Sequence, residues 1–201
     1  MSRILLPAML ASALLTSPAV AQGQGQGQGP GPGAATGTCT GTGVGTGTCT
    51  PVLVPATADE AKWLTFMREE ERLAQDVYQF LGEKWKLKIF QNIALSESKH
   101  TAAVGTLLTR YGLPDPSLGL PAGTYADQGL NELYAQLIAK GSLSIKDALE
   151  VGLTIETKDI ADLETALKVA EKLDIKRVYT NLMDASFNHQ EAFETCLEIF
   201  G

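Results

Sequence analysis

The sequence predicts an all-α protein: a four-helix bundle with one long crossover connection that carries a short extra helix. Four long segments after Thr57 place apolar residues at alternating steps of three and four, a spacing that keeps them on one buried stripe of a helix. The chain contains no convincing run of the alternating residues that form strands. A Pro- and Gly-rich connection over residues 112–127 separates the second and third long segments, which is typical of a bundle with one crossover.

Charge divides the chain into two unlike parts. Residues 1–58 contain Arg3 as their single charged side chain, whereas residues 59–201 carry 15 basic and 23 acidic groups, a net charge of −8. We expect residues 57–201 to form one folded domain, because this length is sufficient to bury one core. The acidic balance excludes a nucleic-acid surface, which needs a basic face.

The first 21 residues have the pattern of a secretory signal peptide. Arg3 supplies a positive start before the apolar run of residues 4–16, and Ala19-Val20-Ala21 forms a small-residue cleavage site. A membrane anchor is the alternative, but the run is shorter than the ~20 apolar residues that a spanning helix needs. We therefore expect an exported protein, periplasmic or extracellular, without stable membrane insertion after cleavage.

Residues 22–56 are expected to be a disordered tether, rich in Gly and Thr. Gly stands at nearly every second position of residues 22–50, and there is almost no apolar surface to bury. Cys39 and Cys49 each lie in the string TGTCT, and outside the cytoplasm they could close a loop or bridge two chains in a homodimer. A metal site at these two thiols is a weaker alternative, because no His or acidic residue lies near them.

The expected helices follow in order from their end signals. Thr57-Ala-Asp-Glu60 is a capping box that opens the first long helix, which runs to about Trp85. The second helix covers about residues 89–111, and Gly112 suits its C-terminal end. A short helix is expected at 128–139, a third long helix at 144–172 after the capping box Ser144 to Asp147, and a fourth at 174–200 with Asp174 as its cap.

Polar residues interrupt the apolar stripes near the middle of all four long helices. They are Glu71 in the first, Glu97 and His100 in the second, Glu156 in the third, and Ser186 and His189 in the fourth. The two histidines of the chain both lie at these interruptions. Because the interruptions occur at matching depth in four helices, they indicate one shared site in the core.

Buried carboxylates need a partner, since an unpaired charge in a core is strongly destabilising. The four stripes contain no Lys or Arg that could neutralise them. A cluster of divalent cations would do so, because carboxylate oxygens and imidazole nitrogens are natural ligands. The spacing of Glu97 and His100 also puts both side chains on one helical face. The plainer alternative is a hydrogen-bonded polar network without metal.

Three further residues lie near these positions. Glu70, on a second apolar stripe, is a rival to Glu71, although a solvated charge or a charge beside the ligands is its more ordinary interpretation. Asp159, one turn beyond Glu156, could face either the site or the surface. Tyr78 lies further along the stripe of Glu71 and could hydrogen-bond a ligand or simply pack in the core.

Several strings of the chain resemble known families. Glu71 with Ala74 and Tyr78, followed by Glu97-Ser-Lys-His100, resembles the first two helices of the ferritin-like superfamily, rubrerythrins especially. The longer strings EEERLAQDVY, FQNIALSESKH, TIETKDIADL and ASFNHQEAF resemble a bacterial family catalogued as domain of unknown function 2202, over about residues 59–200.

This resemblance implies a ferritin-like bundle that holds two iron ions, with Mn, Zn or Cu as alternative metals. The residues that match ligand positions of the superfamily are Glu71, Glu97, His100, Glu156 and His189. Ser186 departs from the pattern, because the superfamily usually has Glu three residues before the last His. Asp159 is the candidate that could compensate for the missing carboxylate.

The expected function is that of an exported di-iron protein which reacts with oxygen or peroxide, an oxidoreductase of peroxidase or ferroxidase type. Glu71 and Glu156 would be terminal ligands, Glu97 would bridge, and Tyr78 would assist the reaction through a hydrogen bond. One alternative is a non-catalytic metal-handling protein loaded with Zn, Mn or Cu. Another is a structural bundle with a buried polar network.

Overall fold

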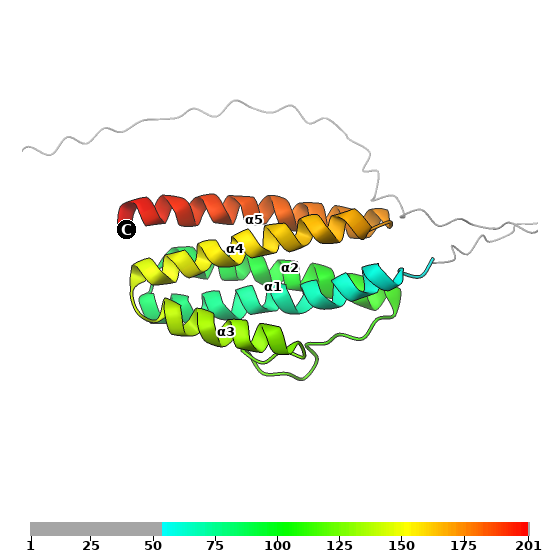
Figure 1. Cartoon of the computed structure of the whole chain (residues 1–201), viewed down its shortest axis with the longest axis horizontal. Helices are drawn as coiled ribbons and strands as arrows, with labels where there is room; N and C mark the ends of the chain where they lie inside the picture. The colour runs from blue at the N-terminus through cyan, green and yellow to red at the C-terminus, as the bar shows by residue number, and fades with distance from the viewer. Residues whose placement is uncertain (1–53, 201) are drawn as a thin grey trace, which may run out of the picture. The chain divides into compact units, whose positions relative to one another are not determined.

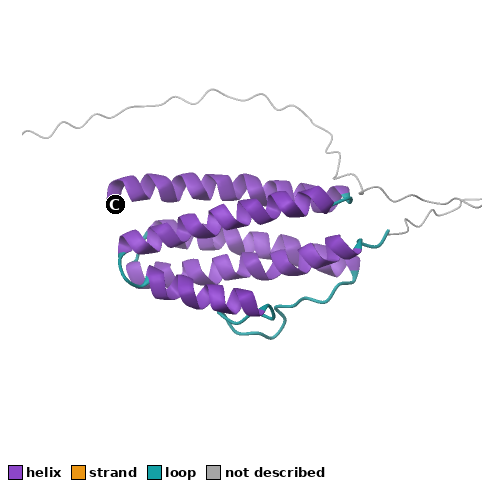
Figure 2. Cartoon of the chain, in the orientation of Figure 1, coloured by secondary structure: helices purple, strands orange, loops and turns teal. Residues whose placement is uncertain are grey.

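The computed structural model describes residues 54–200, and these form five α-helices without a strand (Figure 2). This confirms the all-α prediction. The predicted signal peptide and its cleavage site lie outside the described residues, as do Cys39, Cys49 and most of the predicted tether. None of the five helices is both long enough and apolar enough to cross a membrane.

The four long helices are arranged as two pairs (Figure 1). Helices α1 (Ala58–Trp85) and α2 (Lys88–Tyr111) pack along each other, and so do α4 (Ile145–Val169) and α5 (Leu173–Phe200). The short helix α3 (Gln128–Gly141) lies against α1 and α4. The crossover over residues 112–127 runs along the bundle to the start of α3, as the sequence predicts.

Most helix ends lie where the sequence places them. The Thr57 hydroxyl accepts a hydrogen bond from Glu60 N, and the Glu60 carboxylate accepts one from Thr57 N, so the predicted capping box is formed. Gly112 ends α2 in the left-handed region, with φ of 66°. Two expectations are wrong: α4 ends at Val169 rather than 172, and Asp174 lies in the first turn of α5 rather than before it.

Asp174 has another role than capping. Its Oδ1 accepts a hydrogen bond from the hydroxyl of Tyr111, and its Oδ2 lies 3.2 Å from Nε of Arg110. Both partners belong to the last turn of α2, so Asp174 joins the end of α2 to the start of α5.

Polar side chains of α1 hold the crossover in place. Arg68 pairs with Asp115 at 2.8 Å and donates to Thr101 O, while Arg72 donates to the carbonyls of Leu120, Pro121 and Thr124. The Asp76 carboxylate accepts bonds from Gly123 N and the hydroxyl of Tyr125, both at 2.9 Å. A connection rich in Pro and Gly therefore has a defined path over one face of α1.

The apolar core is divided into two clusters along the bundle. The first includes Tyr78, Phe90 and Phe193 together with residues of α3, and the second includes Met67, Leu163 and other residues near the crossover end. In the sequence of each long helix, a few polar residues lie between the residues of the two clusters. We call these residues the polar layer; they are Glu71, Glu97, His100, Glu156, Asp159, Ser186 and His189. This layer is the interruption that the stripes predict.

Candidate metal centre

Each of the four long helices contributes to one buried cluster of acidic and imidazole side chains. Glu71 comes from α1, Glu97 and His100 from α2, Glu156 from α4 and His189 from α5. The three glutamates are each 2% exposed, and His100 is 8% exposed. The structure therefore brings together five of the six predicted metal ligands, although their ligand role stays a prediction.

Glu97 lies between the two imidazoles. Its Oε2 is 2.8 Å from Nδ1 of His100, and its Oε1 is 2.9 Å from Nδ1 of His189. The two imidazole rings face each other with centroids 5.8 Å apart and an interplanar angle of 26°. One carboxylate thus touches both nitrogen donors with different oxygens, which is the geometry of a bridging ligand.

A second glutamate completes each side. Glu71 Oε2 lies 3.3 Å from Nδ1 of His100, and Glu156 Oε2 lies 3.5 Å from Nδ1 of His189. The potential ligand atoms of Glu71, Glu97 and His100 lie within 4.8 Å of one another, and so do those of Glu97, Glu156 and His189. The cluster is therefore two three-residue sites that share Glu97.

Several buried atoms of this cluster have no hydrogen-bond partner. They include Oε1 of Glu71, Oε1 of Glu97 and Nδ1 of His189. The last two atoms are close, but they are not aligned as donor and acceptor. Unpartnered buried polar atoms are costly, and cations between these oxygens and nitrogens would satisfy them. Two imidazoles and three carboxylates are a donor set that suits divalent iron, manganese or zinc.

The negative charge of Glu97 and the positive charges of protonated His100 and His189 stabilise one another. Burial alone would raise the pKa of Glu97, but the contacts with His100 and His189 outweigh it and lower the pKa to about 2. Burial would lower the pKa of His100, but Glu71 and Glu97 raise it to about 10. The neighbours Glu156 and Glu97 likewise overcome burial and raise the pKa of His189 to about 9.

The outer carboxylates have the opposite tendency. Burial raises the pKa of Glu71 well above its ordinary value, although His100 opposes this, and burial also raises the pKa of Glu156. Without a cation, three carboxylates share two imidazoles, and burial makes the outer glutamates easier to protonate than an ordinary glutamate. Cations would replace those protons, because ligand groups must be deprotonated to coordinate a metal.

Asp159 lies in the polar layer but outside the two three-residue sites. It is 6% exposed, and its Oδ2 accepts a hydrogen bond of 2.6 Å from the hydroxyl of Ser186. Its other oxygen, Oδ1, is buried without a partner. Burial and the charge of Glu71 raise its pKa well above the ordinary value. Asp159 therefore faces the interior rather than the surface, and its ligand role stays a prediction.

Tyr78 is fully buried beside the centre. Its hydroxyl donates a hydrogen bond of 2.6 Å to Oε1 of Glu156 and also lies 3.3 Å from Gly152 O. Its ring packs against Phe90 and Phe193, with centroids 6.2 Å and 5.4 Å away. Burial and the neighbouring Glu156 raise the pKa of Tyr78 well above its ordinary value. Tyr78 thus keeps its proton and orients a candidate ligand.

Glu70 is not solvated. It is 3% exposed, and its Oε1 lies 2.5 Å from Nζ of Lys158. Lys158 also pairs with Asp162 and lies over the ring of Phe66, 5.1 Å from its centroid. The apolar stripes do not indicate this lysine, because Lys158 lies beside the stripe of its helix rather than on it.

Known proteins resemble this chain over most of its length. The family described as an uncharacterized protein domain, DUF2202, matches residues 60–201. The uncharacterized protein MJ0754 of Methanocaldococcus jannaschii is 48% identical over 147 residues, which cover 73% of this chain and 80% of the relative.

Two solved structures are similar to this bundle. The crystal structure of the hypothetical protein MJ0754 from Methanococcus jannaschii has a TM-score of 0.73 at 47% identity, covering 76% of this chain and 87% of that one. A DUF305 fragment from Deinococcus radiodurans has a TM-score of 0.56 at 17% identity, covering 72% and 99%, and shares the fold alone. The family match and the relative together show that this chain belongs to the DUF2202 family.

Proposed function

We propose that the buried cluster is a carboxylate-bridged dinuclear metal centre that reacts with oxygen or peroxide. Iron is the metal that we propose for both positions. The observation that carries this proposal is the position of Glu97, whose two oxygens each approach a different histidine. A single-metal site would not need two Glu–His pairs on opposite sides of one carboxylate. The order of candidate ligands along the helices also resembles that of the ferritin-like superfamily.

Some residues of the centre would bind the metal ions, and Tyr78 would orient one of the ligands. Glu71 with His100 would hold one cation, Glu156 with His189 the other, and Glu97 would bridge them. When bound, two ferrous ions supply the two electrons that reduce peroxide to water or oxygen to peroxide. Tyr78 fixes Glu156 through its hydrogen bond and limits how far that carboxylate can turn. The two apolar clusters exclude bulk water from both sides of the layer.

We further propose that the protein works outside the cytoplasm. Residues 1–21 support this, because they combine a positive start, an apolar run and a small-residue cleavage site. An exported centre of this kind would meet oxygen or peroxide before either reaches the cell interior.

Anaerobic titration of the full chain with Fe(II), followed by exposure to air, tests the proposal. We expect two Fe(II) per chain and a visible absorption band that develops with oxygen. Glu97→Gln should abolish tight binding of the second ion. Glu191→Gln, at an exposed position of α5, is the matched control and should leave both stoichiometry and colour unchanged.

The same titration distinguishes the other two functions. Stoichiometric binding of Zn, Mn or Cu without oxygen-dependent colour would favour a metal-handling protein. Ser186 favours the metal-handling function, since a serine instead of a glutamate at this position leaves α5 with one anionic ligand fewer. If no divalent metal binds, the cluster is a structural polar network and the proposal is wrong.

A further inference from the structure

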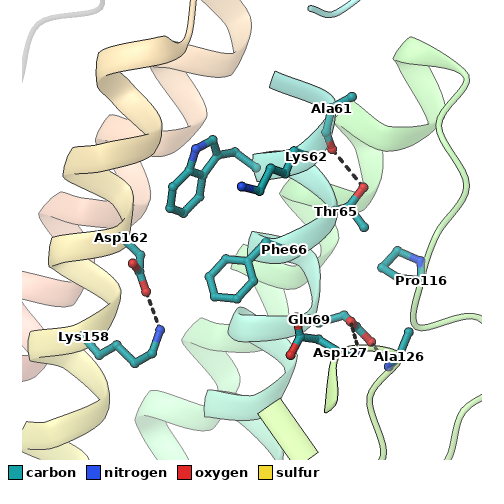
Figure 3. Close-up of a pocket in the computed structure, with 11 residues that line it drawn as sticks. Ala61, Lys62, Thr65, Phe66, Glu69, Pro116, Ala126, Asp127, Lys158 and Asp162 are labelled. Atoms are coloured by element: carbon teal, nitrogen blue, oxygen red, sulfur yellow. Dashed lines mark hydrogen bonds and ion pairs between the residues drawn. The ribbon is translucent and has the colours of Figure 1, made fainter. Parts of the chain in front are cut away.

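A pocket of about 700 Å³ lies on the outer face of α1 (Figure 3). None of the candidate metal ligands lines it. Residues of α1 form its floor, and Lys158 and Asp162 of α4 form one side. Pro116, Ala126 and Asp127 of the crossover form the other side. Pockets of roughly 300 to 1,000 Å³ are typical of small-molecule sites. Its size and place make it a candidate binding site independent of the metal.

Aromatic rings supply the apolar part of this pocket. The rings of Trp63 and Phe66 pack edge to face, with centroids 5.7 Å apart and an interplanar angle of 88°. Both side chains remain partly exposed, and Pro116 lines the far side. Such a surface favours a flat apolar ligand, because planar rings stack on exposed aromatic faces.

The acidic groups around the pocket already have partners in the protein. Both oxygens of Glu69 accept backbone hydrogen bonds, from Ala126 N at 2.5 Å and Asp127 N at 3.0 Å. Asp127 caps α3 through a bond from Leu130 N. Asp162 pairs with Lys158. These carboxylates hold the pocket walls together and are therefore poor attractors for a cationic ligand.

The two lysines that line the pocket, Lys62 and Lys158, differ in whether they have acidic partners. Lys158 is shared between Glu70 and Asp162, whereas Lys62 makes no ion pair or hydrogen bond with any residue in the described range 54–200. Figure 3 shows Lys62 and Phe66 among the α1 side chains that line the pocket. An ammonium group beside an apolar floor suits a ligand with one negative charge at its edge.

We propose that this pocket binds a planar aromatic carboxylate, with its rings against Trp63 and Phe66 and its anionic group at Lys62. The proposal does not depend on the metal centre, because no residue of the polar layer lines the pocket. The proposed ligand of this pocket is therefore an organic anion, separate from the metal ions proposed for the buried cluster.

Naphthalene-2-carboxylate is a suitable probe, and the two tryptophans provide the readout. Trp85 lies at the other end of α1, about 33 Å from Trp63 at ~1.5 Å per residue. In the full chain with ¹⁵N-labelled tryptophan, the Trp63 indole signal should shift saturably during titration and the Trp85 signal should stay in place. Trp63→Phe assigns the two signals.

Charge specificity is tested with variants and with analogues of the probe. Lys62→Gln should weaken binding about twofold to fivefold, the range expected of an exposed charge pair. Lys176→Gln, an exposed lysine of α5, should bind as the parent does. Phe66→Leu should also weaken binding, since the ligand loses one of its ring contacts.

Three results would overturn the proposal. One is that the Trp63 signal does not move, or that both indole signals move together. Another is that naphthalene-2-methanol or 2-naphthylmethylammonium binds as tightly as the carboxylate. The last is that Lys62→Gln leaves the dissociation constant unchanged.

Discussion

The hydroxyl of Ser186, on α5, donates a 2.6 Å hydrogen bond to Oδ2 of Asp159, on α4. The same hydroxyl lies 3.0 Å from Leu182 O, one turn earlier on its own helix. Ser186 is 1% exposed, so this contact lies fully inside the bundle. A carboxylate from α4 therefore meets α5 at Ser186, three residues before His189.

Ser186→Glu should destabilise the metal-free protein and raise its affinity for a second metal ion. A glutamate there would lose the hydrogen bond to Asp159 and set two carboxylates side by side in the core. We expect a loss of about 2–4 kcal/mol in the free energy of unfolding with chelator present. Divalent metal should recover most of it, because binding to the folded state stabilises that state. Urea unfolding with and without metal measures both effects.

Ser186→Ala is the matched control for that substitution. It removes the hydrogen bond but adds no charge, so it should cost about 1–2 kcal/mol whether or not metal is present. If Ser186→Glu destabilises the protein equally with and without metal, α5 does not face a metal site and the buried-network interpretation replaces ours.

Gly152→Ala should destabilise the bundle and disturb Tyr78. A Cβ at Gly152 would lie 2.4 Å from Cε1 of Phe193, and that ring packs against Tyr78 at 5.4 Å. The ring must move, so we expect a loss of about 1–3 kcal/mol in thermal or urea unfolding. Gly105→Ala is the control, since its Cβ would meet Arg68 at an ordinary 3.5 Å and alanine favours the helix. Equal effects of the two substitutions would contradict the packing argument.

Glu60 should contribute to stability at neutral pH and not in strong acid. Burial would raise its pKa, but hydrogen bonds from the backbone N–H groups of Thr57, Lys172 and Glu171 outweigh this and lower it below the ordinary 4.5. A lowered pKa in the folded state stabilises the protein above pH 4.5, and the stabilisation is lost as the pH falls through the folded-state value.

Glu60→Gln should therefore reduce the free energy of unfolding by about 1–3 kcal/mol at pH 7, where charge-assisted hydrogen bonds are lost. The difference from the parent should shrink steadily below pH 4.5. Urea unfolding across a pH series measures it, with Glu164→Gln at an exposed site of α4 as the control. A difference that does not change with pH would show that packing rather than charge explains the loss.

The exported protein should begin at Gln22. This prediction follows from the small residues Ala19, Val20 and Ala21 before that position. Mass spectrometry of protein recovered from its host compartment measures the mature terminus. Retention of Met1, or an attached acyl chain, would contradict the cleavage.

Periodicity predicted much of the fold and of the candidate centre. The steps of three and four identify the buried stripe of each helix, and they locate Glu71, Glu97, His100, Glu156 and His189 without knowledge of helix pairing. The same argument works for Thr57 and Gly112, because caps depend on residues within one turn of the helix end.

Periodicity within one helix does not predict contacts between segments that are distant in the sequence. Periodicity does not indicate the contacts of Arg68, Arg72 and Asp76, which bind Asp115 and backbone groups of the crossover. Glu70 is buried and pairs with Lys158 of α4. Asp174 carries a cap-forming side chain, but it lies in the first turn of α5 and contacts Tyr111 and Arg110 of α2. Each case depends on which helices become neighbours.

The central claim is that Glu97 bridges two metal ions, and anomalous diffraction from crystals loaded anaerobically with Fe(II) tests it most directly. We predict two anomalous peaks per chain, about 3.5–4 Å apart, one beside His100 and one beside His189, with Glu97 touching both. A single peak, peaks that Glu97 does not join, or no peak in the polar layer would contradict the account.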